Sequence, residues 1–293
     1  MSEPVIAVHA GAGTYSDALR QHEAACRDAL QAALESAGAA LEDGQDAVAA
    51  VRSAVMAMES FALFNAGFGS ARCADGSVEM SAAVMRGSDR AAGAVAAITR
   101  TKHPIVGAHA LLDAPQVLMI GDRADEYAAA RGADAWEPSM FVTERQRRRL
   151  EEREAGDSPG EHGTVGAVCL DSAGLLAAAT STGGRLGQPP GRVGDTPLIG
   201  AGTWADRTVA VSCTGEGEAF IRVGAARLLA ALVEQGIALE AAAQTVLDEV
   251  HSCGGGGGLI AVDARGNVAT PFSTEAMPRG VWRAGGNLTL ELT

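Results

Sequence analysis

The chain has 293 residues, of which 47% are hydrophobic, 20% charged and only 4% aromatic, and its formal net charge is −13. This length is enough for one large domain with a sizeable core, and the 37 glycines together with many alanines predict a core of small side chains. The negative charge argues against nucleic acid or an anionic membrane as a partner, because phosphate binding needs clustered Lys and Arg.

The first half of the chain predicts a buried strand, two amphipathic helices and then a mixture of short elements. A β-branched run followed by Gly11 and Gly13 indicates the first strand, and apolar positions at three- and four-residue steps indicate the helices. The expected elements are strands at 5–8, 78–84, 94–98 and 117–120, and helices at 16–42, 46–58, 103–112 and 124–131.

Residues 132–163 are expected to form a linker, because prolines, glycines and charges accumulate there without apolar periodicity beyond a short helix near 143–153. The basic cluster Arg145, Arg147, Arg148 and Arg149 alternates with glutamates, which is typical of a solvated helix face.

After this linker the pattern changes at once to a predicted hairpin, with strands at 164–170 and 175–180 around a turn at Gly174. The remaining expected elements are strands at 209–213, 259–262 and 268–271 and helices at 218–235 and 239–250. Because both halves supply strands and amphipathic helices, we expect sheets sandwiched between helix layers in a single domain.

The cysteines and the apolar pattern indicate where the protein works. Five cysteines are widely spread and lack any C-x-x-C or Cys/His ligand spacing, which argues against a disulfide framework and a zinc site and favours a reducing compartment. The N-terminal residues lack a basic region, and no apolar run approaches the roughly 18 residues of a membrane span. We therefore expect a cytoplasmic protein with no membrane partner.

Thr164 is the first candidate for chemistry, because it begins a buried strand directly after the linker. If the chain were cut before Thr164, its own α-amine, with a pKa of about 8, could take the proton from its hydroxyl. Gly163 has no side chain, so its backbone can adopt the conformation that an attack by this hydroxyl requires. The alternative is an ordinary β-branched residue that starts a strand.

Several motifs in one order resemble the plant-type L-asparaginase and isoaspartyl-peptidase family of N-terminal-nucleophile (Ntn) hydrolases. The resemblance runs from residue 5 to about residue 277. The motifs are VHAGAG (8–13), LFNAGFGS (63–70), DGSVEM (75–80), HGTVGAVCLD (162–171), AAATSTGG (177–184), PGRVGDTPLIGAG (190–202) and SCTGEGE (212–218).

This resemblance implies the α+β class and a four-layer αββα Ntn-hydrolase sandwich formed as one domain by residues 1–293. It also implies autocatalytic cleavage between Gly163 and Thr164 into an N-terminal chain (1–163) and a C-terminal chain (164–293), which stay associated and form a homodimer. The expected reaction is hydrolysis of L-asparagine to aspartate and ammonia, cleavage of β-aspartyl dipeptides, or both.

The motifs also imply roles for single residues. Thr164 is the expected nucleophile, Thr182 is the hydroxyl that bonds with it, and Thr214 with the backbone amide of Gly215 forms the oxyanion hole. From its spacing alone the same glycine-rich segment would be a turn that caps a following helix.

Further matches imply a substrate pocket. Arg192 is the expected partner of the substrate α-carboxylate and Asp195 that of its α-ammonium, Gly217 lines the amine pocket, and Asn65 lies near the nucleophile. Without the resemblance, Arg192 and Asp195 would be interpreted as a surface ion pair.

No organic cofactor is expected, and the small-molecule substrate is the expected partner besides a second copy of the chain. The segment 58–68 resembles a loop that binds a sodium ion through main-chain carbonyls. The expected ligands are Met58, Glu59, Phe61, Phe64, Ala66 and Phe68.

The chain departs from the family pattern at Ser81, where an acidic residue is usual, and at residues 185–189, which lack a common Thr-Asn pair. Two alternatives remain open. A glycosylasparaginase-like hydrolase would be favoured by secretory targeting and disulfides, and a catalytically silent binding protein by failure to cleave. A nucleotide-binding protein is disfavoured, because no G-x-x-x-x-G-K-[ST] motif is present.

Overall fold

The computed structural model describes residues 3–14, 20–155, 163–285 and 287–293. Its larger sheet contains strands from both halves of the chain in the order β12-β11-β1-β5-β6-β2-β3-β4, and all neighbours are antiparallel except β3 and β4. The strands are β1 (Val5–His9), β2 (Met80–Arg86), β3 (Ala92–Ile98), β4 (Leu118–Ile120), β5 (Val165–Leu170), β6 (Leu176–Thr182), β11 (Arg279–Arg283) and β12 (Asn287–Glu291).

The smaller sheet is antiparallel, in the order β10-β9-β8-β7. Its strands are β7 (Thr203–Ala205), β8 (Val209–Gly215), β9 (Gly257–Asp263) and β10 (Val268–Ala269). It packs on the larger sheet through contacts of β8 with β5 and β6, and of β9 with β1 and β5.

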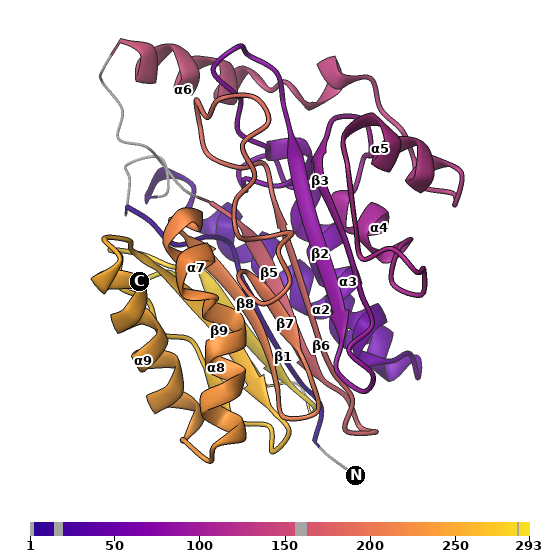
Figure 1. The fold of residues 1–293 in the computed structure, drawn as a ribbon, viewed down its shortest axis with the longest axis vertical. Coiled ribbons are helices and arrows are strands. Elements are labelled where there is room, and N and C mark those ends of the chain that lie inside the picture. Colours follow the sequence, from indigo (N-terminus) through magenta and orange to yellow (C-terminus); the bar gives the residue numbers. More distant parts are fainter. Residues whose placement is uncertain (1–2, 15–19, 156–162, 286) are drawn as a thin grey trace.

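Helices cover the two outer faces of the stacked sheets, as Figure 1 shows. On the larger sheet, α2 (Glu23–Glu42) contacts β1 and β11, α3 (Ala47–Glu59) contacts β5 and β6, and α4 (Pro104–His109) contacts β2 and β3. On the smaller sheet, α8 (Ala225–Glu234) contacts β8 and α9 (Leu239–Ser252) contacts β9. The layers of this mixed α+β fold are therefore helices, sheet, sheet and helices.

The side chains of β5 illustrate why the layers stack in this order. Val165, Ala167 and Cys169 are fully buried in the core between the larger sheet and its helices. Val168 and Leu170 alternate with them and are fully buried in the core between the two sheets. A strand that is apolar on both faces must be covered on both faces, and small alanines in β6 allow the close approach.

Most expected elements are confirmed, and some boundaries are wrong. The helix expected at 218–235 is broken by Gly224, whose φ of 63° ends α7 (Gly217–Val223) before α8 begins. The helix expected at 103–112 ends at His109. The helix expected at 16–42 is confirmed as α2 over Glu23–Glu42, and residues 15–19 lie outside the described part. The strands β7, β11 and β12 were not predicted.

The expected linker contains packed structure over its described part, in the form of the turn η2 (Pro138–Phe141) and the helix α6 (Glu144–Glu154). Phe141 is fully buried beside Trp136. The buried Gln146 of α6 donates to the Gly69 carbonyl at 2.6 Å. Residues 156–162 of the expected linker, including His162 of the cleavage motif, lie outside the described residues.

The prediction of a solvated face for the basic cluster is correct for only part of it. Arg147 and Arg148 are exposed and pair with Glu144. Arg145 is half-buried and donates to the Leu63 carbonyl at 3.0 Å, because α6 lies against the loop that follows α3. The prediction is therefore wrong for Arg145, which anchors α6 to this loop.

Candidate active site

Thr164 lies at the open end of the β5–β6 hairpin. The antiparallel register pairs Val165 with Ser181. Thr164, which precedes Val165, and Thr182, which follows Ser181, therefore lie close together. The Thr164 hydroxyl donates a hydrogen bond to Thr182 Oγ1 at 3.2 Å, and only 7% of Thr164 is exposed. The hairpin therefore holds a nearly buried hydroxyl pair at the end of the larger sheet.

The Gly163 carbonyl oxygen accepts two side-chain hydrogen bonds. Thr182 Oγ1 donates one at 2.9 Å and Asn65 Nδ2 donates the other at 2.8 Å. Asn65 is itself fixed, because it also donates to the Gly184 carbonyl at 2.7 Å and accepts from the Ala71 amide at 2.7 Å. The carbonyl next to the Thr164 hydroxyl is thus polarised by two oriented donors.

A close approach explains why position 163 requires glycine. A Cβ atom on Gly163 would lie 2.8 Å from Asn65 Cβ, which is closer than packed carbon atoms allow. Any other residue would push the carbonyl away from Asn65 or displace Asn65.

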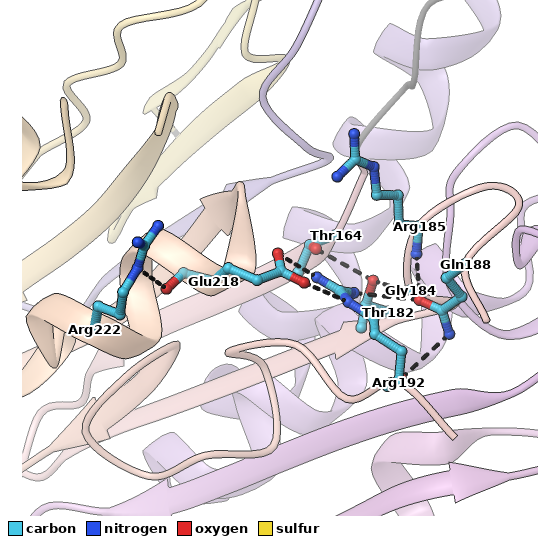
Figure 2. Close-up of polar contacts among 8 residues, drawn as sticks. All are labelled: Thr164, Thr182, Gly184, Arg185, Gln188, Arg192, Glu218 and Arg222. Atoms are coloured by element: carbon cyan, nitrogen blue, oxygen red, sulfur yellow. Dashed lines mark hydrogen bonds and ion pairs between the residues drawn. The ribbon is translucent and has the colours of Figure 1, made fainter. Parts of the chain in front are cut away.

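Arg192 is held by three side-chain hydrogen bonds, which Figure 2 draws. Its Nε and Nη2 donate to the two carboxylate oxygens of Glu218 at 2.9 Å each, and its Nη1 donates to Gln188 Oε1 at 3.2 Å. These hydrogen bonds from Arg192 lower the pKa of Glu218 to about 2. Because a guanidinium has five N–H groups, two remain to bind another anion.

Asp195 lies next to this guanidinium but is buried, with 5% exposed. Burial raises its pKa to about 7, and its Oδ2 has no hydrogen-bond partner among the described residues. An unsatisfied buried carboxyl oxygen is unfavourable unless a donor joins it. The interpretation of Arg192 and Asp195 as a surface ion pair is therefore wrong.

Because Gly217 has no side chain, the space next to Asp195 and Arg192 stays open. A Cβ atom there would lie 2.9 Å from Asp195 Oδ1 and 3.1 Å from Arg192 Nη2. The backbone of α7 can therefore approach a cationic and an acidic group at the same time, which matches the two charged groups of an α-amino acid.

Thr214 and Gly215 end β8 beside the hairpin. The buried Thr214 Oγ1 accepts from the Ala12 amide at 3.2 Å, so its own hydrogen can be donated elsewhere. Gly215 has a φ of +144°, and a Cβ atom on it would lie 2.3 Å from the Gly256 carbonyl oxygen. Only glycine therefore fits at this position of the strand.

One recess, which we call the active-site recess, brings most of these residues together. The residues that line it are Gly163, Thr164, Thr182, Gly184, Arg185, Arg192, Gly194, Asp195, Thr196 and Gly215. It combines a hydroxyl, a cation and an acidic side chain, which is the set needed to hold an amino acid and attack its side-chain carbonyl. Residues far apart in the sequence thus meet as expected for Thr164, Thr182, Arg192, Asp195 and Gly215.

A buried polar chain below the hairpin was missed by the sequence analysis. His9 Nε2 bonds with Ser212 Oγ at 3.0 Å, Ser212 with Thr180 Oγ1 at 2.8 Å, and Thr203 Oγ1 donates to Thr180 at 2.7 Å. Burial lowers the pKa of His9 to about 3, so the imidazole is neutral. The only signal in the sequence was the position of His9 at the end of the first strand.

The departures Ser81 and 185–189 both border the recess. Ser81 is paired with Thr182 across β2 and β6, which places it beside the hydroxyl pair. Gln188 is buried and bonds Arg192, as described above, although nothing in its sequence context marked it as functional.

Comparisons with known proteins agree with this arrangement. The model of the family described as "Asparaginase" matches residues 2–290. A protein of Salmonella typhimurium named isoaspartyl peptidase is 44% identical, with 99% of this chain and 98% of the relative covered. An Escherichia coli protein of the same name is 44% identical over 99% of this chain and 96% of its own. A Homo sapiens isoaspartyl peptidase/L-asparaginase is 42% identical over 73% of both chains.

Proposed function

The chain belongs to the asparaginase family, and on this premise we propose that it is an autoprocessing threonine hydrolase that cleaves the side-chain amide of L-asparagine and the isopeptide bond of β-aspartyl dipeptides. The proposal assigns the fold to the αββα Ntn-hydrolase class. It divides the chain into an N-terminal part (1–163) and a C-terminal part (164–293) of one domain.

The arrangement around the Gly163 carbonyl is the single observation that carries this proposal. The Thr164 hydroxyl lies beside a carbonyl that Asn65 and Thr182 both hold by hydrogen bonds. Attack of Thr164 Oγ1 on the Gly163 carbonyl carbon forms a C–O bond and places negative charge on the oxygen that these two donors hold. An ordinary strand residue would not need such a polarised neighbour.

Self-cleavage is then completed in two further steps. The tetrahedral intermediate collapses with rupture of the C–N bond to Thr164, whose nitrogen takes a proton and becomes a free α-amine. Water hydrolyses the resulting ester, which releases the Gly163 carboxylate and restores the Thr164 hydroxyl. Thr182 lies between the attacking hydroxyl and the carbonyl oxygen, so it can pass a proton between them.

In the cleaved enzyme the α-amine of Thr164 takes the proton of its hydroxyl, which attacks the side-chain carbonyl of the substrate. Arg192 binds the α-carboxylate through its two remaining N–H groups, and Asp195 accepts the α-ammonium on its unpartnered oxygen. Thr214 and the Gly215 amide hold the oxyanion. Ammonia or an amino acid leaves, and water releases aspartate from the acyl-enzyme.

We propose that a structural sodium ion binds at the end of α3 and in the loop that follows it, held by the carbonyls of Met58, Glu59, Phe61, Phe64, Ala66 and Phe68. Three of them, on Met58, Phe61 and Ala66, accept one backbone hydrogen bond each and keep a second lone pair for a hard cation. The ion would brace the loop that carries Asn65. A higher unfolding temperature in sodium chloride than in choline chloride would support this site.

A pair of substitutions tests the proposed nucleophile. Thr164→Ala should abolish both self-cleavage and turnover, whereas Thr164→Ser should keep both because it retains the hydroxyl. Hydrolysis of L-asparagine or of a β-aspartyl dipeptide by the Thr164→Ala protein would refute the proposal. We also propose that the cleaved protomers form a homodimer, which sedimentation of the purified enzyme can test.

A further inference from the structure

Residues 185–189 form a loop in which the chain departs from the family pattern, and α6 holds this loop in position. Leu186 is fully buried and packs with Leu150 of α6 and with Ala71. A Cβ atom on Gly187, whose φ is +66°, would lie 2.5 Å from Nε of Arg153. The loop is therefore fixed against the rest of the fold. The backbone positions of its residues that line the active-site recess are fixed as well.

Arg185 lines the active-site recess from this loop. Its backbone amide donates to Gln188 Oε1 at 2.8 Å, which fixes the residue at its Cα. Its Nε is buried and has no hydrogen-bond partner, and among the described residues its guanidinium forms no ion pair. A buried guanidinium nitrogen without a partner is unfavourable, so the site gains when an anion binds there.

Arg192 in the same recess, unlike Arg185, has a carboxylate partner. Glu218 neutralises Arg192 through two hydrogen bonds, whereas Arg185 keeps its positive charge in a chain whose net charge is −13. The positive charge of Arg185 lies close enough to Glu218 to contribute to the lowered pKa of the Glu218 carboxylate.

Arg185 and Arg192 start from different positions around Thr164 in the active-site recess. Arg185 directly follows Gly184, whose amide donates to Thr182 Oγ1 at 3.1 Å. The backbone of Arg185 therefore lies next to the hydroxyl pair of Thr164 and Thr182. In the view of Figure 2 the Arg185 guanidinium extends away from Arg192 and Glu218, and Thr164 is drawn between the two guanidinium groups.

The chemistry of the proposed substrates then gives Arg185 a specific ligand. The aspartyl part of the substrate occupies Arg192 and Asp195, so the leaving group must lie on the other side of the carbonyl that Thr164 attacks. From L-asparagine this group is ammonia, which carries no carboxylate. From a β-aspartyl dipeptide it is an amino acid with a free α-carboxylate, which matches an unpaired guanidinium in charge and geometry.

We propose that Arg185 binds the α-carboxylate of the leaving amino acid and thereby makes β-aspartyl dipeptides with a free carboxylate the preferred substrates over L-asparagine. This inference rests on the proposed hydrolase function of the same recess. Arg185 would act as a specificity-determining residue that does not take part in bond making or breaking.

Three substrates and three variants test the proposal. The substrates are a β-aspartyl dipeptide, the same dipeptide with its C-terminal carboxylate converted to an amide, and L-asparagine. The variants are Arg185→Gln, Arg185→Lys and the control Arg222→Gln. Arg222 is exposed on α7, outside the residues that line the recess, so its substitution removes the same charge from nearby.

For the wild type we expect the free dipeptide to have a KM about 10- to 100-fold below that of its amide, which is the range expected of one charge-assisted hydrogen-bonded pair. Arg185→Gln should remove this difference, raise KM for the free dipeptide alone and leave the rate of self-cleavage unchanged. Arg185→Lys should recover part of the difference, and Arg222→Gln should behave as the wild type.

Three outcomes would overturn the inference, and they do so in different ways. Equal KM values for the free and amidated dipeptides in the wild type, or an Arg185→Gln variant that changes all three substrates alike, would overturn the role of Arg185 but leave the hydrolase function intact. A cleaved wild-type protein that hydrolyses none of the three substrates would overturn the proposed function, and this inference with it.

Discussion

The substitution Asn65→Ala tests the polarised Gly163 carbonyl, on which the proposed self-cleavage depends most. Asn65 Nδ2 is one of two side-chain donors to the Gly163 carbonyl oxygen, at 2.8 Å, and Thr182 is the other, at 2.9 Å. Removal of one donor that stabilises a developing oxyanion costs about 3–4 kcal/mol, which is a rate decrease of about 10²–10³-fold. We therefore expect Asn65→Ala to slow self-cleavage by about this factor.

The assay is a time course of the uncut chain, followed on denaturing gels and by intact mass. Asn65→Ala also leaves the Ala71 amide and the Gly184 carbonyl without this partner, so a folding defect must be distinguished from a slow reaction. Asn65→Asp serves this purpose, because its carboxylate can still accept from Ala71 but cannot donate to Gly163. Both variants should retain a cooperative unfolding transition and cleave slowly.

A control for the loss of an asparagine is Asn267→Ala in the exposed turn after β9, where the side chain bonds only locally with Asp263. This variant should cleave at the wild-type rate. If Asn65→Ala or Asn65→Asp cleaved as fast as the wild type, the polarisation of the Gly163 carbonyl by Asn65 would not contribute to the reaction, and the reasoning would be refuted.

Three other substitutions or conditions probe the remaining features. Arg192→Ala should raise KM about 10- to 100-fold while self-cleavage is unchanged, because the side chain binds the substrate carboxylate but not Gly163; an unchanged KM would remove Arg192 from the site. Since the pKa of Asp195 is raised to about 7, its carboxylate becomes protonated as the pH falls through this value. Inhibition of the cleaved enzyme by L-aspartate should therefore weaken about tenfold per pH unit below about pH 7 and level off above it, and a flat profile would contradict this assignment. In Gly166→Ala the new Cβ would lie 2.0 Å from Ser212 Oγ and 2.4 Å from His9 Nε2. This overpacking should cost about 1–3 kcal/mol and lower the unfolding temperature by several degrees, whereas an unchanged transition would argue against a rigid contact.

The sequence predicts the nucleophile hairpin well, because its residues are neighbours in the chain. The motifs around Thr164 and Thr182 flank one tight turn, so local patterns are enough to place both hydroxyls at the same end of two paired strands. The linker composition and the abrupt start of a buried strand also indicate the position of the proposed cleavage site.

The contacts that complete the site depend on long-range packing and could not be predicted in this way. Asn65 reaches Gly163 across a separation of 98 residues, because Asn65 follows α3, which packs on β5, and Gly163 lies just before that strand. The buried His9 gains its role from Ser212 of β8, which lies 203 residues away in the sequence. No periodicity in the chain encodes such contacts.

Some elements were missed for local reasons. β7 has three residues and is too short to show alternation. β11 begins and ends with the half-buried Arg279 and Arg283, and β12 ends with the exposed Glu291, so charged residues interrupt their apolar pattern. Gly224 lies within a continuous apolar period, so only its left-handed backbone reveals the break between α7 and α8. The described part of the expected linker packs through Phe141 and Gln146, two positions in an otherwise polar segment.

The most direct test of the proposed function is the intact mass of the purified protein after prolonged incubation, combined with N-terminal sequencing and assays of aspartate release from L-asparagine and from a β-aspartyl dipeptide. Cleavage into two fragments, the second beginning at Thr164, with aspartate released from at least one substrate, is the result that we predict. A chain that stays uncut and releases no aspartate from either substrate would contradict the proposal of a self-cleaving threonine hydrolase.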